Sequence, residues 1–226
     1  MILLHGFFSS GTHQWVRTGF ASVLANSGHR VIMPDLRAHG DSAAPRCAGK
    51  YPRDVLTDDA FALVEYLRLT NYDLGGYSLG ARTAVRMLGR GAAPRRAFVA
   101  GQGLHEVIGR GGEVAAFLRR VFSNPGTFAP GTREWKAEQW LAATGGDPLA
   151  LSRVLDSVVD TSREVVAGIA VPTLVVTGSE DDRDGSATAL AQALPRGTHT
   201  TVPGDHTTAV TAPELAEAVV AFLGDQ

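Results

Sequence analysis

Short apolar runs alternate with longer stretches of helical spacing in the first hundred residues. Runs of four or five mainly apolar residues indicate strands buried on both faces, and apolar residues three or four positions apart indicate helices packed on a core. The pattern predicts strands at 1–4, 30–34, 72–76 and 96–100, and helices at 14–26, 54–69 and 81–88. Strands that alternate with helices form a parallel sheet through right-handed connections.

This alternation stops between residues 101 and 170, where only helical patterns occur. The pattern predicts helices at 114–122, 132–144 and 147–159, and Thr132 and Asp147 are suitable N-caps for the last two. Strand and helix patterns then return, with strands at 171–178 and 198–202 and helices at 186–194 and 213–223. We therefore expect an α/β core made of residues 1–104 and 171–226, with residues 105–170 forming a helical cap.

The segment Gly76-Tyr77-Ser78-Leu79-Gly80 joins a predicted strand directly to a predicted helix. A serine on such a sharp turn is pushed clear of the sheet, and small residues two positions to either side avoid collisions with the neighbouring strand and helix. The Leu79 N–H would lie at a helix start, where partial positive charge is available. This pattern predicts that Ser78 is a nucleophile.

A serine hydroxyl needs a base within hydrogen-bond reach and an acid that orients the base. His206, just past the last predicted strand, is the histidine best placed to be the base. The acid is expected in the loop after residues 171–178, which holds four carboxylates at 180, 181, 182 and 184. Asp181 is our first choice and Asp182 the alternative, whereas Asp184 precedes a helix and is better suited to capping it.

Acyl transfer also requires hydrogen-bond donors for a developing oxyanion. The backbone N–H groups of Leu79 and of Phe7, in the loop His5-Gly6-Phe7, are the candidates, and the His5 imidazole is expected to stabilise the turn. Around them we expect a substrate site for an apolar acyl or aromatic group. The predicted residues of this site are Phe8, Tyr77, Gln102, Leu104, Trp135 and Trp140. The alternative for Trp135 and Trp140 is that both pack within the cap.

Five segments of the chain resemble the α/β-hydrolase superfamily. They are residues 3–7 (LLHGF), 35–42 (DLRAHGDS), 76–80 (GYSLG), 172–178 (PTLVVTG) with Asp181, and 204–206 (GDH). The resemblance implies a catalytic triad of Ser78, Asp181 and His206, an oxyanion hole from the Phe7 and Leu79 amides, and a lid at 105–170. It also implies a mostly parallel sheet with helices on both faces.

The chain departs from that family at its start. Family members usually begin with an antiparallel hairpin before the His-Gly strand, and this sequence has none, so we expect it to begin later than its relatives. The sheet should then have about six strands, with residues 31–33 at an uncovered edge. Gly109-Arg110-Gly111-Gly112 follows no predicted strand, and we interpret it as a flexible hinge of the lid rather than a phosphate loop.

Composition narrows the classes of partner. The formal net charge is −2 and no long basic run occurs, which predicts neither nucleic-acid nor membrane binding. The single cysteine, Cys47, excludes an intrachain disulfide and favours the cytoplasm, and no signal-peptide layout is present. The seven histidines show no helical pair at metal-binding spacing, so we expect no metal and no cofactor. The sequence leaves open whether the protein forms a homodimer.

We therefore expect a serine hydrolase that cleaves a carboxylic ester, or a related thioester or lactone, of a small apolar molecule. Epoxide hydrolases and haloalkane dehalogenases of the superfamily carry Asp at the position of Ser78, which argues against both. C–C bond hydrolases, hydroxynitrile lyases, perhydrolases and some ligand receptors keep the triad. A non-hydrolytic binding or natural-product tailoring protein is the alternative from another class.

Overall fold

The computed structural model describes residues 1–109 and 112–224, and its centre is a parallel sheet. The strands are β1 (Ile2–Leu4), β2 (Leu74–Tyr77), β3 (Ala97–Ala100), β4 (Thr173–Gly178) and β5 (Gly197–Val202). They lie in the order β1-β2-β3-β4-β5, and every neighbouring pair is parallel. Strands β1 to β4 are buried along their whole length, as their apolar runs predict.

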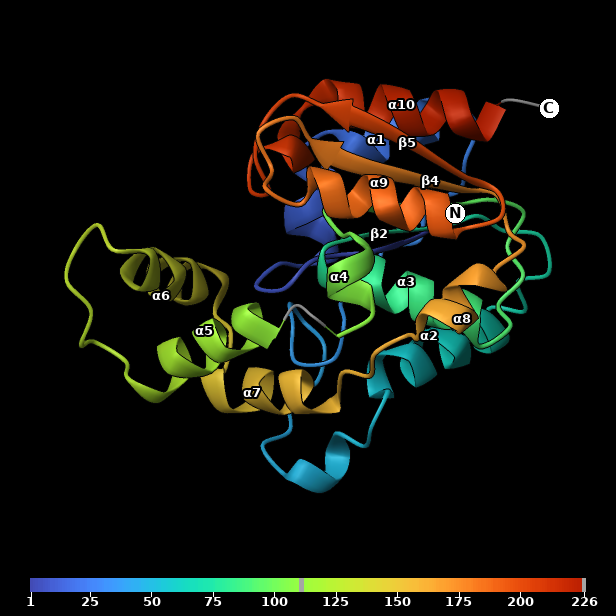
Figure 1. The fold of residues 1–226 in the computed structure, drawn as a ribbon. Helices are drawn as coiled ribbons and strands as arrows, with labels where there is room; N and C mark the ends of the chain where they lie inside the picture. The colour runs from blue at the N-terminus through green and yellow to red at the C-terminus, as the bar shows by residue number, and fades with distance from the viewer. Residues whose placement is uncertain (110–111, 225–226) are drawn as a thin grey trace.

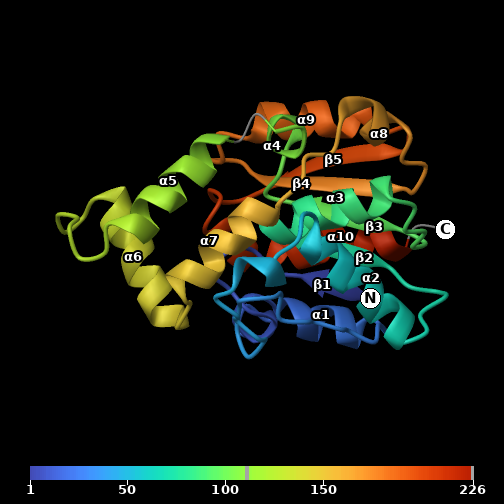
Figure 2. The same ribbon diagram turned by 90° about the horizontal axis from the view of Figure 1, so that it is seen from below.

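Helices cover both faces of this sheet (Figure 1 and Figure 2). One face packs on α1 (Phe20–Asn26) and α10 (Pro213–Gly224), and the other on α2 (Val55–Tyr66), α3 (Leu79–Gly89) and α9 (Asp184–Ala193). Because strand side chains alternate in direction, Leu3 lies in the first of these two cores, whereas Ile2 and Leu4 lie in the second. The predicted α/β architecture is confirmed.

Three helices of the predicted cap form a lobe beside the sheet, seen at the left of both views (Figure 1, Figure 2). They are α5 (Gly112–Ser123), α6 (Arg133–Thr144) and α7 (Pro148–Ser157). The Thr132 hydroxyl caps α6 by accepting from the Trp135 N–H, and Asp147 caps α7 through the N–H groups of Leu149 and Ala150. The flanking helices α4 (Leu104–Val107) and α8 (Arg163–Ala167) contact α3 and α9 of the core.

The structure differs from the predicted elements in two places near the N-terminus. Residues 31–33 form a single bridge, Ile2 to Ile32, instead of a sixth strand, and Pro34 has no N–H to extend the ladder. The predicted helix 14–26 is divided into a π-helical turn, η1 (Thr12–Val16), and α1. Gly19, in the left-handed conformation with φ of +82°, separates them.

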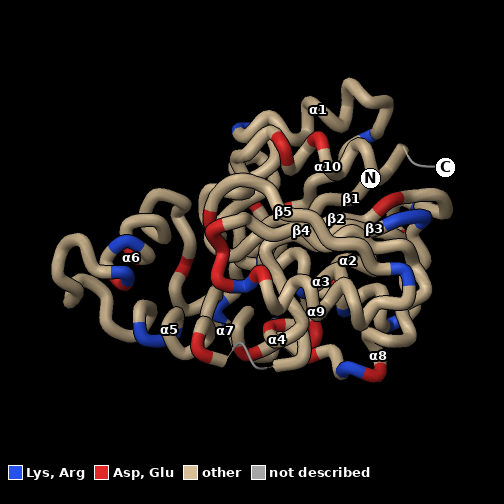
Figure 3. The backbone as a smooth tube through the Cα atoms, turned by 45° about the horizontal axis from the view of Figure 1, so that its top comes forward, with Lys and Arg blue, Asp and Glu red and all other residues tan. Residues whose placement is uncertain are grey.

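Two short 3-10 helices, η2 (Ala48–Lys50) and η3 (Ala209–Thr211), complete the described elements. Arg110 and Gly111, the middle of the glycine-rich segment interpreted as a hinge, lie outside the described residues. Within residues 1–109 and 112–224, no helix combines the length and the apolar character that crossing a membrane requires. The four carboxylates that follow β4 lie at the edge of the sheet where the parallel strands end (Figure 3).

Candidate active site

Ser78 occupies a strained turn between β2 and α3. Its backbone has φ of +52° and ψ of −112°, a region that side chains disfavour, and its N–H donates to the Ala100 carbonyl at 2.8 Å. A Cβ on Gly76 would lie 2.3 Å from the Gly80 carbonyl carbon, and one on Gly80 would lie 2.0 Å from the Leu4 carbonyl oxygen. The turn that lifts Ser78 therefore depends on glycine at both positions.

His206 and Asp181 converge on Ser78 from the loops after β5 and β4. His206 Nε2 lies 3.1 Å from Ser78 Oγ, and His206 Nδ1 lies 3.2 Å from Asp181 Oδ2. The Asp181 side chain is 1% exposed and that of His206 is 28% exposed. Three residues from three strand ends thus form one continuous line of hydrogen bonds.

Asp181 is held in its ionised form. Burial alone would raise its pKa, but hydrogen bonds from His206 and the Arg183 N–H, together with the Arg183 guanidinium, hold the pKa of Asp181 well below its usual range. An ionised Asp181 accepts from Nδ1–H, which leaves Nε2 free to accept the Ser78 proton. Asp182 is 93% exposed and, among the described residues, makes no hydrogen bond to His206.

Tyr77, which was predicted to line the substrate site, contacts His206 in the structure. Its hydroxyl donates to the His206 carbonyl at 2.8 Å, and the two rings lie 5.6 Å apart. Burial raises the pKa of Tyr77, so the phenol stays a donor. Because β2 side chains alternate, Tyr77 points into the core on the α1 and α10 side, one residue before Ser78.

The loop at the end of β1 passes directly beside Ser78. A Cβ on Gly6 would lie 3.4 Å from Ser78 Cβ. The fully buried His5 donates through Nδ1 to the Gly6 carbonyl at 2.8 Å and accepts at Nε2 from the Leu36 N–H at 2.9 Å. Burial lowers the pKa of His5 to about 4, so the imidazole is neutral. It joins two loops, in line with the turn-stabilising role expected.

Two backbone N–H groups beside Ser78 have no acceptor within the described part of the chain. Leu79 is the first residue of α3, where the helix supplies no carbonyl for the N–H. The Phe7 N–H follows Gly6, whose own N–H donates to Gln14 Oε1 at 2.8 Å. Gln14 comes from the π-helical turn and was not predicted, because side-chain contacts to a distant loop leave no periodic signal.

A hydrogen bond joins Phe8, in the loop at the end of β1, to Trp140 of α6. The Trp140 indole Nε1–H donates to the Phe8 carbonyl at 2.8 Å. Phe8 also packs its ring on Phe7 and on Phe122 of α5, with centroid separations of 4.8 and 5.7 Å. The sequence pattern placed Phe122 only on the apolar face of a cap helix, so its role beside the predicted oxyanion loop was missed.

The other residues predicted to line the substrate site lie in different environments. Gln102 is buried after β3 with its Oε1 unpaired among the described residues. Leu104 is 1% exposed and belongs to the hydrophobic core. Trp135 is half-buried on α6, and none of the aromatic contacts or side-chain hydrogen bonds of the described residues joins it to the Phe7–Phe8 loop.

The sequence model of a family described as the alpha/beta hydrolase fold matches residues 1–192 of the 226-residue chain. The chain belongs to the α/β-hydrolase family. This α/β hydrolase is also 32% identical over 84 residues to an epoxide hydrolase of Caballeronia sordidicola, a match that covers 37% of this chain and 25% of the relative. Its matches to curated relatives span 25% to 33% of those proteins' own lengths.

Solved structures match the α/β hydrolase over almost its full length. A bromoperoxidase from Bacillus anthracis superposes with a TM-score of 0.73 at 26% identity, covering 99% of this chain and 91% of the other. The enol-lactonase from Burkholderia xenovorans LB400 also reaches 0.73, at 23% identity, covering 99% and 90% of the two chains. This second likeness shows the fold alone. Within the described residues, no group of three His, Cys, Asp or Glu side chains could hold a metal ion.

Proposed function

We propose that this α/β hydrolase cleaves a carboxylic ester, or a related thioester or lactone, through an acyl-enzyme on Ser78. The observation that carries the proposal is the hydrogen-bonded line from Ser78 through His206 to the buried Asp181. Two N–H groups that have no acceptor among the described residues, those of Phe7 and Leu79, support the proposal as candidate oxyanion donors. Nucleophile, base, orienting acid and oxyanion donors are the parts that acyl transfer requires.

The first half of the reaction forms the acyl-enzyme. Ser78 Oγ attacks the ester carbonyl carbon while its proton passes to His206 Nε2, and the carboxylate of Asp181 stabilises the imidazolium. The carbonyl oxygen becomes an oxyanion that accepts hydrogen bonds from the Phe7 and Leu79 N–H groups. The tetrahedral intermediate collapses as His206 gives its proton to the leaving alkoxide, which departs as the alcohol.

The second half returns the enzyme to its starting state. A water molecule loses a proton to His206 and attacks the acyl carbon, and the same two N–H groups hold the second oxyanion. Collapse breaks the bond to Ser78 Oγ, which takes the proton back from His206, and the carboxylic acid leaves.

The aromatic side chains near Ser78 favour an apolar substrate. Phe7, Phe8 and Phe122 form one cluster, with Phe7 and Phe122 stacked at 6.1 Å. Such a surface gains free energy by removing apolar groups from water, at ~25 cal/mol per Å² of buried surface. An acyl chain or aromatic ring suits it better than a charged group.

The likeness to an epoxide hydrolase does not extend this proposal to epoxides. A carboxylate nucleophile attacks an epoxide carbon and forms an ester, whereas Ser78 offers a hydroxyl that would form an ether, which water does not cleave under mild conditions. The elbow residue therefore favours carbonyl chemistry.

Turnover of p-nitrophenyl acetate and p-nitrophenyl butyrate by the wild type and by Ser78→Ala tests the proposal. We expect the variant to keep its circular dichroism spectrum and to lose at least ~10³-fold in kcat. Ser22→Ala, at an exposed serine of α1, should retain full activity. Equal turnover by wild type and Ser78→Ala would contradict the mechanism. A wild type that turns over no ester but binds one ligand tightly would support the non-hydrolytic alternative.

A further inference from the structure

Phe8 has a backbone conformation that bulky side chains disfavour. Its φ is +59°, in the left-handed region that bulky side chains rarely adopt. Such a residue is strained and persists only where surrounding contacts hold it. The neighbouring Phe7 carries one of the proposed oxyanion donors, so the groups that hold Phe8 also control that donor.

Contacts from the cap hold Phe8. The Trp140 indole donates to the Phe8 carbonyl at 2.8 Å, although the two residues are separated by 132 positions in sequence. Phe122 of α5 packs its ring against the same residue at 5.7 Å. Relaxation of Phe8 to negative φ would reorient the Phe7–Phe8 peptide, which shares the Phe7 Cα with the Gly6–Phe7 peptide that carries the proposed donor N–H.

Core packing does not explain the position of Trp140. Trp140 is 43% exposed. Among the described residues its ring contacts the ring of His13, with the two ring centroids 5.9 Å apart. A tryptophan buried for its apolar area would lie deeper than this. The specific contact of the Trp140 side chain is the hydrogen bond from its indole N–H to the Phe8 carbonyl of the strained loop.

The cap is fastened differently at its base. Arg82 of α3 binds both the Asp160 carboxylate and the Glu106 carbonyl, which lie at the two ends of the cap. The Thr161 N–H donates to the Val107 carbonyl at 3.0 Å, which joins the same two ends. Arg82 lies one helical turn after Ser78, so the base of the cap is anchored to the helix that carries the nucleophile.

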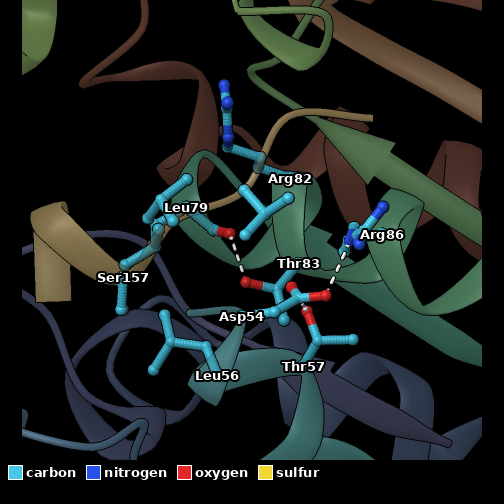
Figure 4. A pocket seen from close by; sticks show the side chains of 10 residues that line it. Asp54, Leu56, Thr57, Leu79, Arg82, Thr83, Arg86 and Ser157 are labelled. Atoms are coloured by element: carbon cyan, nitrogen blue, oxygen red, sulfur yellow. Dashed lines mark hydrogen bonds and ion pairs between the residues drawn. The ribbon is translucent and has the colours of Figure 1, made fainter. Parts of the chain in front are cut away.

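The end of α7 is also tied to the core near this base. The Asp54 N–H donates to the Ser157 carbonyl at 2.7 Å, and the Asp54 carboxylate pairs with Arg86. Figure 4 shows the side chains of Asp54, Arg86 and Ser157 around a pocket. The volume of this pocket, about 20 Å³, is room for about one water molecule. Against these several bonds at the base, the outer end of the cap reaches the Phe7–Phe8 loop through Trp140 and Phe122.

We propose that Trp140 is a positioning residue: its indole N–H holds Phe8 left-handed and thereby keeps the Phe7 N–H directed at the oxyanion. This inference rests on the proposed ester hydrolysis and deepens it. The contact of the cap with the loop thus completes the proposed oxyanion hole. Trp140 touches no reacting atom and acts through the loop.

Trp140→Phe tests the inference, because phenylalanine keeps an aromatic ring and removes the N–H donor. We expect kcat for p-nitrophenyl butyrate to fall about tenfold, the value of one hydrogen bond of ~1.4 kcal/mol, with KM within twofold. The Ki of butylboronic acid, which forms a tetrahedral adduct on Ser78, should rise by the same factor. Gln139→Ala, at an exposed neighbour on the same helix, should change neither quantity.

The outcomes separate this inference from the proposed function. Unchanged kcat and boronate affinity in Trp140→Phe, with an active wild type, would overturn the inference and leave ester hydrolysis standing. Equal losses in Trp140→Phe and Gln139→Ala would also overturn it, since they would indicate general damage to the cap. A wild type without any esterase activity would contradict the proposed function itself, and the inference would fall with it.

Discussion

The two sides of Ser78 are built in different ways. On one side, His206 and Asp181 stand on loops of the sheet and are joined by hydrogen bonds at 3.1 and 3.2 Å, with Tyr77 and Arg183 behind them. On the other side, the Phe7–Phe8 loop is strained and takes contacts from the cap. Among the described residues, the side that we propose transfers protons takes no hydrogen bond from the cap, whereas the proposed oxyanion side takes one from Trp140.

The charges of the two sides differ as well. Asp181 is buried yet ionised, because Arg183 and His206 surround it. Beneath the oxyanion loop, His5 and His39 are buried and neutral, and their rings lie 5.1 Å apart. The charged Asp181 carboxylate orients the His206 ring through a hydrogen bond. His5 and His39, by contrast, pack against each other as neutral rings.

Breaking the proton-transfer side should have the largest effect. Asp181→Asn removes the carboxylate that selects the His206 tautomer, and we expect kcat to fall by roughly 10³ to 10⁴. Asp182→Asn, at the 93% exposed neighbour, should keep kcat within twofold. Steady-state kinetics with p-nitrophenyl butyrate provide the comparison. Equal losses in the two variants would remove the distinction between these carboxylates.

The turn between the two sides should tolerate no added side chain. Gly80→Ala places a Cβ 2.0 Å from the Leu4 carbonyl oxygen, and we expect a loss of about 3 kcal/mol in the free energy of unfolding. Gly185→Ala in α9 meets nothing within 4 Å and should be neutral or stabilise by up to ~1 kcal/mol. Urea denaturation monitored by circular dichroism measures both. An unchanged midpoint for Gly80→Ala would contradict the geometry of the turn.

The oxyanion side should be the acid-sensitive one. Burial lowers the pKa of His5 to about 4, and burial with the neighbouring His5 lowers that of His39 to about 3, from 6.5 in both cases. Between pH 6.5 and 4 the unfolded chain binds more protons than the folded one, so the free energy of unfolding falls as pH falls, by on the order of 3 kcal/mol from His5 alone. The depressed pKa of Asp181 acts in a lower window, below its unfolded value.

Denaturation at several pH values between 7 and 4.5 checks this dependence. His39→Gln removes one group that, in this pH range, titrates only in the unfolded state, and the stability of the variant should therefore change less steeply with pH than that of the wild type. A wild type whose stability is independent of pH in this range, or equal slopes for both proteins, would show that the buried histidines do not control acid sensitivity.

The support behind His206 should give the smallest effect. Tyr77→Phe removes the hydrogen bond to the His206 carbonyl, which is worth ~1 kcal/mol, and should lower kcat by a factor of about five. Kinetics of this variant beside Trp140→Phe compare one supporting hydrogen bond on each side of Ser78. A loss as large as that of Asp181→Asn would mean that the position of His206 depends on Tyr77 far more than one neutral hydrogen bond allows.

The sequence predicted most of the core because its signals are local. The glycines around Ser78 mark a turn, and apolar runs mark four of the five strands; β5, although half exposed, was still found near its observed bounds. The order of Ser78, Asp181 and His206 along the chain was also readable, and the structure brings these side chains together. Their catalytic roles remain a proposal.

The sequence did not predict contacts that depend on how distant segments meet. Residues 31–33 have the pattern of a strand, but only one bridge forms, and Pro34 has no N–H to extend it. Tyr77 was assigned to the substrate space, although strand alternation places it on the opposite side from the cap. Nothing in the spacing of Trp140 indicates that its N–H reaches Phe8. Long-range side-chain geometry leaves no periodic trace.

The central claim is that Ser78 is a nucleophile activated by His206. Treatment of the purified protein with a fluorophosphonate, followed by peptide mass spectrometry, tests it most directly. The account predicts a single adduct on Ser78 and a labelling rate at least ~10³-fold lower in His206→Ala. An unlabelled Ser78 in the folded wild type, or equal labelling rates in the two proteins, would contradict it.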